Sequence, residues 1–499
     1  MSFFLKSKLL DFTTGGGVTV AVLNEKEGIS YGIRAGDKIR LTWSKHKLMT
    51  VTAQFTETKV KRGEIGLFEE IWKHHTVDED DIVQVDIESR PASIEAIKKR
   101  FLGKKLTYKE IYSIISDIAT GKLGRVETTY FVATGFFKPY TDIELFYMTK
   151  AMAETGEMMN LPYEVVDKHC IGGVPANRTT LVMIPIIASL GLYIPNTSSR
   201  AITSPSGTSD TMEVLAPVSF SMDEIKNIVK KTHACIVWGG GLSLAPSDDI
   251  IIKLSHPLAY EPYDKMLTSI MSKKVAIGVD YLVLDIPIGP YAKVKDKKSA
   301  ELLAKKFQFL AKKFNMKIKV VFTQAFEPIG RGIGPSLEAR DVLRVLQQHK
   351  LKPNDLEDNS IKLCADLLEL KGFCKKGEGK KIAQKQLTSG KAWEKMNEII
   401  VAQGGKKDIL CEEVAVGALH YEIHAEKDGK ITDINNPAIK LICVNLGAPE
   451  DKLAGMHIHV RHGEKVKKGQ KLFTLYASSE DRMQLGIVST EKNQVLKIQ

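Results

Sequence analysis

The chain has 499 residues, 43% of them hydrophobic, which is too long for one ordinary domain and apolar enough to fill the cores of about three. Its net charge of +11 comes from 71 basic and 60 acidic residues, many of them in short lysine and arginine clusters, and indicates a solvated basic surface rather than a nucleic-acid face. No apolar run reaches the roughly 18 to 20 residues of a membrane span. We therefore expect a cytoplasmic protein that binds neither membranes nor nucleic acid.

Residues 1–88 predict a small, barrel-like β domain at the N-terminus. Short runs rich in β-branched residues, at 17–23, 38–43, 49–55 and 82–87, are separated by turns of Gly, Asp and Lys. This spacing is typical of an all-β domain with short connections.

Residues 89–160 predict a helical bundle domain, which a later segment at about 246–280 joins. Two capping boxes, each a Thr followed three residues later by a Glu, begin at Thr107 and Thr141. Both precede apolar residues that recur at helical spacing, so we expect each box to start a helix of the bundle.

Residues 161–419 predict an α/β domain with a mostly parallel sheet. Short apolar strands, clearest at 235–238, 281–286 and 317–322, alternate with helix-length runs. Ligands of such sheets bind beyond the carboxyl ends of the strands. We therefore expect the loops that follow these strands to form a binding site.

Two loops of the α/β domain have the composition of an anion site. Residues 168–177 form a glycine-containing turn ahead of an apolar, helix-length run at 181–190, so backbone N–H groups at the helix start face the turn. Residues 198–208 contain four Ser and two Thr hydroxyls together with Arg200, ahead of a helix-like run at 212–215. Hydroxyls, N–H groups and fixed cations are the groups that bind phosphate.

Residues 420–499 predict a small C-terminal domain that is β-rich or α+β, because Gly and Val recur there with the rhythm of barrel-sandwich hairpins. No lysine stands in a Met-Lys-Met context, so we expect no prosthetic group.

His457, His459 and His462 lie close in sequence, but no Glu or Cys completes a ligand set, so we expect no metal. The six cysteines lack CxxC spacing and indicate reduced thiols.

Six segments stand in a distinctive order and spacing along the chain: KHCIGGVPANRTT, IPNTSSRAITSPSGTSDTMEVL, WGGGLSLAPSDD, LTSIMSKK, LDIPIGPYAKV and PIGRGIGPSLEARDVL. Together they resemble the thymidine phosphorylase family of glycosyltransferases, and within it most closely the AMP phosphorylase branch. The resemblance covers nearly the whole chain, including an N-terminal β domain that ordinary thymidine phosphorylases lack.

The resemblance implies an enzyme that uses inorganic phosphate to cleave the N-glycosidic bond of a nucleoside 5'-monophosphate. With AMP the products are adenine and ribose 1,5-bisphosphate, and CMP and UMP stay open as further substrates. The resemblance implies no cofactor, since phosphate is a co-substrate, and it implies a homodimer or a larger homo-oligomer.

Carried over position by position, the resemblance also implies a set of site residues. The phosphate-binding residues are Lys168, Thr179, Ser198 and Thr208; the nucleotide-binding residues are Gly173, Ser199, Arg200, Ala201, Ile202, Thr203, Ser204, Thr208, Ser269 and Lys293; the base-proximal lysine is Lys273; and the proton donor is Glu261.

The chain departs from the family pattern at three positions. Glu261 stands in LAYEP where the family has an aspartate, and its extra methylene moves the carboxyl by about 1 Å. Cys170 replaces a serine hydroxyl, and a thiol is a poorer hydrogen-bond donor. Leu254 stands where pyrimidine-specific enzymes have an arginine that reads the base, which fits a purine substrate.

Two alternative functions stay open. One is a thymidine or pyrimidine nucleoside phosphorylase. The other is a non-catalytic nucleotide-binding or nucleic-acid-binding protein on the same fold, which would fit Cys170, Glu261 and the positive net charge.

Overall fold

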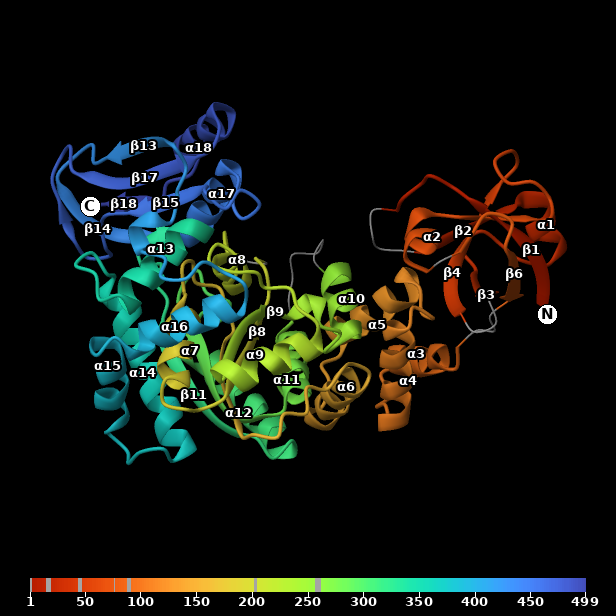
Figure 1. Cartoon of the computed structure of the whole chain (residues 1–499), viewed down its shortest axis with the longest axis horizontal. Helices are drawn as coiled ribbons and strands as arrows, with labels where there is room; N and C mark the ends of the chain where they lie inside the picture. Colours follow the sequence, from red (N-terminus) through yellow and green to blue (C-terminus); the bar gives the residue numbers. More distant parts are fainter. Residues whose placement is uncertain are drawn as a thin grey trace. The chain divides into compact units, whose positions relative to one another are not determined.

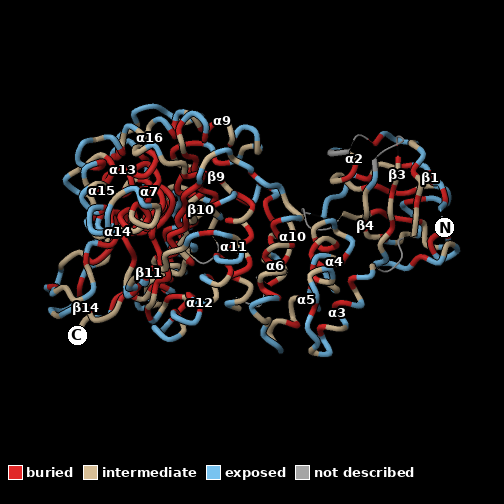
Figure 2. Tube along the Cα trace, turned by 90° about the horizontal axis from the view of Figure 1, so that it is seen from below, coloured by how far each residue is buried: buried red, intermediate tan, exposed pale blue. Residues whose placement is uncertain are grey.

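The computed structural model describes residues 2–14, 19–43, 47–75, 77–87, 91–201, 204–255 and 262–499. Its chain divides into two compact units (Figure 1). The first unit is formed by Met1–Thr155 and Pro246–Asp264, and the second by Gly156–Ala245 and Lys265–Gln499. Buried residues run along the strands and the inner helix faces of each unit (Figure 2).

Six strands close into a barrel at the N-terminus, in the order β1-β5-β2-β4-β3-β6, which confirms the predicted β domain. β1 is parallel to β5 and β2 is parallel to β4, while the other pairs are antiparallel. Leu23, Leu41 and Val85 fill the interior. The sequence predicted four of these strands and missed β1 and β5, because β5 is very short and β1 mixes Phe and Leu with Ser and Lys. The elements are β1 (Ser2–Leu9), β2 (Val20–Asn24), α1 (Glu25–Ser30), β3 (Lys38–Trp43), β4 (Lys47–Thr56), β5 (Glu64–Leu67), α2 (Glu69–His75) and β6 (Ile82–Ile87).

Helices form the rest of the first unit, and α10 packs on α4 and α5 although it follows them by more than one hundred residues of sequence. Both predicted capping boxes are present. The Thr107 and Thr141 hydroxyls accept hydrogen bonds from the backbone N–H of Glu110 and Glu144, at 3.4 and 3.3 Å. The helices are α3 (Ser93–Phe101), α4 (Tyr108–Ala119), α5 (Arg125–Phe137), α6 (Asp142–Glu154) and α10 (Pro246–Ser255).

Parallel strands form the centre of the second unit. One sheet has the order β11-β10-β7, β8 pairs with β9, and a bridge between Val165 and Tyr193 connects the two pairings. Every one of these pairs is parallel, which confirms the predicted sheet. The strands are β7 (Val165–Cys170), β8 (Ile194–Ser198), β9 (Ala234–Trp238), β10 (Val279–Ile288) and β11 (Lys317–Gln324).

Two local predictions are wrong at their boundaries. β7 continues through Cys170, so the first loop begins after this residue and not at Lys168. Pairing with β10 extends the strand through polar residues that composition assigned to a loop. The sequence predicted a helix at 212–215. The short helix α8 (Thr208–Met212) instead starts directly after Gly207 and ends at Met212.

Helices surround these strands and build the largest core. α7 (Thr179–Ala188) is buried along its whole length and packs on α14 and α16, as its apolar run predicted. The remaining helices are α9 (Met222–Thr232), η1 (Gly239–Gly241), α11 (Tyr263–Ile277), α12 (Lys297–Lys313), α13 (Pro335–Leu346), α14 (Asn354–Lys371), α15 (Gly379–Thr388), α16 (Lys391–Ala402) and η3 (Cys411–Glu413).

The C-terminal segment has strands and two helices, which confirms the predicted α+β character. Its larger sheet has the order β12-β15-β17-β13 and takes β12 from the segment before α13, and its smaller sheet has the order β16-β14-β18. The elements are β12 (Gly332–Ile333), β13 (Leu419–His424), β14 (Gly429–Ile434), α17 (Asn436–Leu446), β15 (Gly455–Ile458), β16 (Lys465–Val466), β17 (Lys471–Ala477), α18 (Glu480–Lys492) and β18 (Leu496–Ile498).

Two further properties concern the chain as a whole. All six cysteines are free thiols, in agreement with the sequence prediction. Among the residues that the structure describes, no helix combines the length and the apolar character that crossing a membrane requires.

Candidate active site

The first predicted anion loop holds its lysine in a fixed position. Lys168 lies on β7 with only 2% of its surface exposed. Its Nζ donates to the hydroxyls of Thr179, at 2.8 Å, and Thr180, at 3.2 Å, which both lie in the first turn of α7. The Thr179 hydroxyl in turn donates to Asn177 Oδ1 at 2.8 Å. The structure thus brings the predicted phosphate residues Lys168 and Thr179 together at a helix N-terminus, where an anion is favoured.

Gly173 lies against the loop that follows β10, at Ala292 and Lys293. The residue has φ +92°, and a Cβ atom at this position would lie 3.0 Å from the backbone nitrogen of Lys293. A larger residue would therefore be strained and would push the two loops apart. The glycine lets the predicted nucleotide residues Gly173 and Lys293 touch.

The second predicted anion loop folds around the carboxylate of Asp210. Its Oδ2 accepts hydrogen bonds from the backbone N–H groups of Ala201, at 2.7 Å, and Gly207, at 2.8 Å. At the start of the loop the Ser198 hydroxyl lies 2.7 Å from the Ser209 hydroxyl. The loop is held closed at both ends, and the Ala201 N–H is used for this internal contact.

Arg178 joins the two loops to each other. Its Nη1 donates to the carbonyl of Asn177 at 3.0 Å and to the Thr208 hydroxyl at 3.4 Å, and its Nη2 donates to the carbonyl of Ser206. Its Nε donates to the carboxylate of Glu338 on α13. Because Arg178 bonds to both loops, the two loops form one cradle rather than two separate turns. Both side chains of its ion pair with Glu338 are buried.

Arg200 lies in an ion pair within the second loop. Its two guanidinium nitrogens donate to the two carboxylate oxygens of Glu213 at 2.6 Å each, and the guanidinium lies 5.0 Å from the ring of Trp238. Arg200 holds the pKa of Glu213 at about 2, and Lys452 also bonds this carboxylate, at 2.6 Å. The observed arrangement gives Arg200 a role in holding the loop.

The charges of four lysines act on His169, which follows Lys168 on β7. The pKa of His169 lies well below its ordinary value, first because of burial and then because of the charges of Lys274, Lys168, Lys273 and Lys293. Three of these lysines are predicted site residues, and Lys168 lies more than one hundred positions before Lys273 and Lys293 in the sequence. Ser269 lies four residues before Lys273 on α11. The arrangement concentrates positive charge beside the cradle and keeps His169 neutral.

Cys170 is a protonated thiol in this setting. Burial, and then the charge of Asp285, raises its pKa to about 12. Its Sγ accepts a hydrogen bond of 3.4 Å from Asn177 Nδ2. A thiol with this pKa is a poor nucleophile, and its contact orients Asn177.

Three predicted site residues lie outside the described residues: Ile202, Thr203 and Glu261. Sequence reasoning also missed four residues that organise the cradle, namely Asp167, Arg178, Asp210 and Lys274. Asp167, Arg178 and Lys274 have decisive partners far away in the sequence or in another loop, so no local spacing identifies them. Asp210 accepts from the backbone of Gly207, three residues before it, and this capping position is a local signal that could have identified it.

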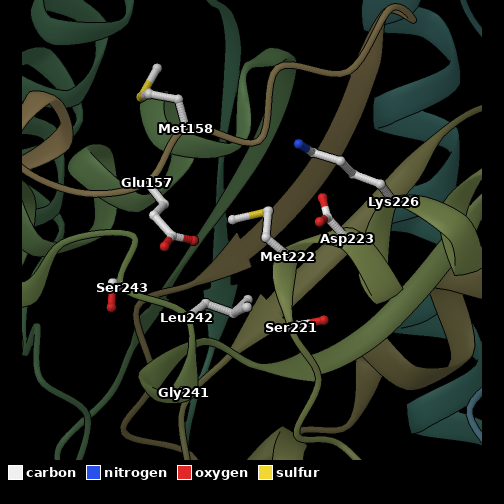
Figure 3. Close-up of a pocket in the computed structure, with 9 residues that line it drawn as sticks. All are labelled: Glu157, Met158, Ser221, Met222, Asp223, Lys226, Gly241, Leu242 and Ser243. Carbon is white, nitrogen blue, oxygen red and sulfur yellow. The ribbon is translucent and has the colours of Figure 1, made fainter. Parts of the chain in front are cut away.

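A pocket of about 560 Å³ opens elsewhere in the second unit, between the start of α9 and the segment after η1 (Figure 3). Glu157, Asp223 and Lys226 give it a polar wall. None of the predicted site residues lines this pocket. The cradle and the pocket are therefore separate features.

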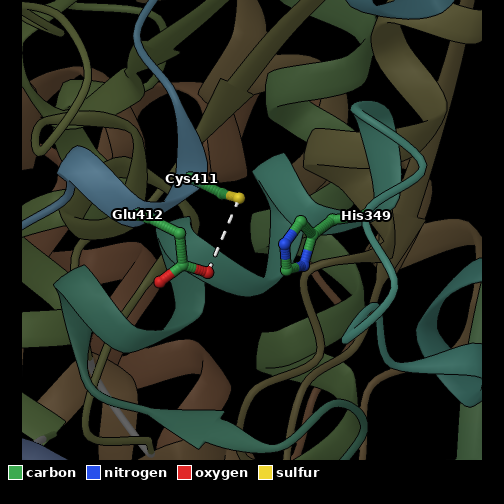
Figure 4. Close-up of side chains that lie close together, drawn as sticks. All are labelled: His349, Cys411 and Glu412. Atoms are coloured by element: carbon green, nitrogen blue, oxygen red, sulfur yellow. Dashed lines mark hydrogen bonds between the residues drawn. The ribbon is translucent and has the colours of Figure 1, made fainter.

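Among the described residues, one group of side chains has the composition of a metal site. His349, Cys411 and Glu412 bring one ligand atom each to within 4.8 Å of one another (Figure 4). However, Glu412 Oε1 accepts hydrogen bonds from Arg344 at 3.0 and 3.3 Å. A guanidinium on this oxygen opposes a cation there, and the group is explained by the ion pair between α13 and η3.

Three family descriptions match the chain in order. The helical bundle domain of a glycosyl transferase family matches residues 94–156, the a/b domain of that family matches residues 162–393, and the pyrimidine nucleoside phosphorylase C-terminal domain matches residues 430–497. The first two agree with the helical and α/β parts of the fold, and the third covers the C-terminal segment from β14 to β18.

Curated relatives match over nearly the entire chain. AMP phosphorylase from Methanocaldococcus jannaschii is 42% identical over 484 residues, which is 97% of this chain and 95% of the relative. AMP phosphorylase from Pyrococcus furiosus is 40% identical over 495 residues, which is 99% of this chain and 97% of the relative. The chain belongs to the AMP phosphorylase family. This membership confirms the resemblance that the six segments indicated.

Solved structures share the fold of the AMP phosphorylase family at greater distance. Anthranilate phosphoribosyltransferase from Thermus thermophilus superimposes with a TM-score of 0.52 and 16% identity, covering 62% of this chain and 99% of its own. The enzyme from Saccharomyces cerevisiae gives 0.51 and 15%, covering 63% and 98%. At this identity the likeness concerns the fold alone.

Proposed function

We propose that this chain is a pentosyltransferase that cleaves AMP with inorganic phosphate to give adenine and ribose 1,5-bisphosphate. The observation that carries the proposal is the cradle, in which Arg178 joins two anion loops at the carboxyl ends of β7 and β8. Lys168, Lys273 and Lys293 add positive charge beside it. Curated relatives named AMP phosphorylase, at 40 to 42% identity, support the choice of substrate.

The proposed reaction is a displacement at C1' of the ribose. A phosphate oxygen forms the new bond to C1' while the bond from C1' to the base nitrogen breaks, and the electron pair of that bond leaves with the base. Positive charge develops on the ribose ring as the bond stretches, and the bound phosphate faces it with negative charge. Groups that are already positioned for this charge distribution lower the barrier most.

The proposal assigns the side chains to the two substrates and the leaving base. Lys168 and Thr179 are supported as phosphate ligands by their direct contact at the start of α7. Glu261, which lies outside the described residues, donates a proton to the departing base. The remaining assignments are Ser198 and Thr208 for phosphate; Gly173, residues 199–204, Thr208, Ser269 and Lys293 for the nucleotide; and Lys273 beside the base. No cofactor is required.

A homodimer through the helical part of the first unit belongs to the same proposal. α3 and α5 present an apolar hollow of about 480 Å³ that includes Phe101, Leu102 and Tyr130. Leu102 is 75% exposed and Tyr130 is 55% exposed, and an apolar patch of this kind is often an interaction surface. We place the enzyme in the cytoplasm, where nucleoside monophosphates and phosphate occur together.

The proposal is tested by incubating the enzyme with one nucleotide or nucleoside at a time, with and without phosphate. Release of free base is measured for AMP, CMP, UMP, adenosine, thymidine and uridine. The expected result is phosphate-dependent release from AMP, with no release from the nucleosides. Release from thymidine or uridine alone would instead indicate a nucleoside phosphorylase, and AMP binding without base release would indicate a non-catalytic protein.

A further inference from the structure

A buried carboxylate lies directly behind the predicted phosphate lysine. Asp167 is on β7, one residue before Lys168, and it is fully buried. Its Oδ1 accepts hydrogen bonds from the backbone N–H of Lys168, at 2.7 Å, and from Asn196 Nδ2, at 2.9 Å. Its Oδ2 accepts a hydrogen bond from Nζ of Lys274, whose side chain is 1% exposed. We call these groups the Asp167 network.

The Asp167 network joins three elements, β7, β8 and α11. On each element a predicted site residue lies one or two positions from the residue that takes part in the network. β7 carries Lys168. β8 carries Asn196 and, two residues later on the same side of the strand, Ser198. α11 carries Lys274 immediately after Lys273. One carboxylate therefore fixes the relative positions of the two proposed phosphate residues, Lys168 and Ser198, and of the helix that carries the proposed base-proximal residue Lys273.

Stability alone does not account for an ion pair at this place. The neighbouring residues Val166, Ile194 and Ile236 are fully buried and apolar. Apolar side chains of similar size commonly replace a buried ion pair without loss of stability, because removing two charges from water is costly. A fixed geometry, which hydrogen bonds with defined directions provide, is what the network adds over apolar packing.

The network also sets the charge that the site presents. Among the four lysines that lower the pKa of His169, Lys274 has the largest effect. Asp167 directly offsets the charge of Lys274, whereas Lys168 donates to the hydroxyls of Thr179 and Thr180 at the start of α7. Without Asp167, Lys274 would be a buried charge without a partner, which is costly in free energy.

We propose that Asp167 and Lys274 are positioning residues for phosphorolysis, which act through Lys168, Ser198 and Lys273 without touching either substrate. This inference rests on the function proposed above. It predicts that removing the ion pair weakens phosphate binding and turnover even where the fold is kept.

The test uses a charge-balanced double variant, Asp167→Asn with Lys274→Met, together with the milder Asn196→Ala. The melting temperature, kcat, KM for phosphate and the affinity for inorganic phosphate by isothermal titration calorimetry are measured for each. For the double variant we expect a fall of about 10- to 100-fold in kcat/KM for phosphate and at least tenfold weaker phosphate binding. For Asn196→Ala we expect smaller losses in the same direction, at a melting temperature close to that of the unchanged enzyme.

A matched control comes from the other unit. Arg100 and Glu144 form an ion pair with side chains that are 1% and 2% exposed, at 3.5 Å, and neither is a predicted site residue. Arg100→Met with Glu144→Gln should lower stability without changing the affinity of folded protein for phosphate. Such a result would show that losing a buried ion pair does not in general weaken phosphate binding, so that the effect of the double variant is specific to Asp167 and Lys274.

The inference is overturned if the double variant and Asn196→Ala both bind phosphate as tightly as the unchanged enzyme. The calorimetric titration gives this answer whether or not AMP is cleaved. If the unchanged enzyme binds phosphate but releases no adenine from AMP, the proposed function fails. The difference in phosphate affinity between the variants then still decides whether Asp167 and Lys274 position the phosphate residues.

Discussion

At the scale of single residues, Lys168 is oriented before any substrate binds. Its contacts with Thr179 and Thr180 direct its ammonium toward the start of α7, and its burial keeps water from competing for the charge. A donor that is already in place needs no reorganisation when charge develops, and this is usually the largest contribution to catalysis. The motif predicted Lys168 and Thr179 as phosphate residues, and the structure places these two side chains in contact. The support from Asp167 and Lys274 could not be predicted, because 107 positions separate these two residues.

Replacing the proposed proton donor should impair turnover much more than binding. For Glu261→Gln we expect a loss of about 10² to 10⁴-fold in kcat, since an amide cannot donate the proton that the leaving base needs. Affinity for AMP, measured by equilibrium dialysis, should change by less than about threefold, because the side chain keeps its size. Glu157→Gln, at an exposed carboxylate away from the cradle, is the control. A Glu261→Gln enzyme with unchanged kcat would remove this residue from the mechanism.

His169 should make the stability of the protein depend on pH in a defined direction. Its pKa in the folded protein lies well below the ordinary value of 6.5, so the unfolded chain binds the proton first as the pH falls. The stability due to neutral His169 is therefore complete above about pH 6.5 and decreases below it, by at most about 1.4 kcal/mol per pH unit. Thermal unfolding of the unchanged protein and of His169→Asn between pH 8 and 5 measures this. Parallel curves for the two proteins would contradict the expected shift.

At the scale of elements, the cradle depends on contacts between segments that are remote in sequence. The sequence predicted the strands β9, β10 and β11 from short apolar runs that alternate with helix-length segments, and the helix α7 from its long and uniform apolar run. It placed the end of β7 and the position of α8 wrongly, because pairing with β10 and the closing contacts of Asp210 decide those boundaries. The pairing with β10 leaves no periodic pattern in the chain. The contact of Asp210 with Gly207 spans three residues and is a local capping signal.

Breaking the ion pair between the cradle and α13 should destabilise the second unit. Arg178→Met leaves Glu338 buried without its partner, and burial already raises the pKa of this carboxyl. We expect a loss of about 3 to 5 kcal/mol in the free energy of unfolding, measured by urea denaturation. Adding Glu338→Gln should recover part of this loss, because the neutral amide no longer requires a cation. Equal stability of the single variant and the unchanged protein would show that the ion pair does not hold the loops.

At the scale of the whole molecule, the chain combines a closed β barrel and helices in one unit with the parallel sheets, the cradle and the C-terminal sheets in the other. Composition and spacing predicted these classes of structure, because the short β runs at residues 1–88 differ plainly from the alternating strands and helices at residues 161–419. They did not predict that β12, at residues 332 and 333, pairs with β15. A strand of two residues has no sequence signature, and its partner lies more than one hundred positions away.

Phosphate should stabilise the second unit in the intact chain. A ligand that binds only the folded state adds about 2.7 kcal/mol at a concentration 100 times its dissociation constant. Scanning calorimetry in phosphate and in chloride of equal ionic strength should therefore show a higher melting temperature in phosphate. Lys168→Met, which removes the central cation of the cradle, should abolish the difference. Identical transitions of the unchanged protein in the two salts would contradict a phosphate site.

The proposed enzyme transfers the 5-phosphoribosyl group of AMP to inorganic phosphate, and this transfer is tested most directly by following AMP and phosphate with the enzyme by ³¹P nuclear magnetic resonance. We expect one equivalent of ribose 1,5-bisphosphate to appear for each equivalent of adenine, with loss of one equivalent of inorganic phosphate. Formation of ribose 5-phosphate without consumption of phosphate, or no reaction of AMP, would contradict it.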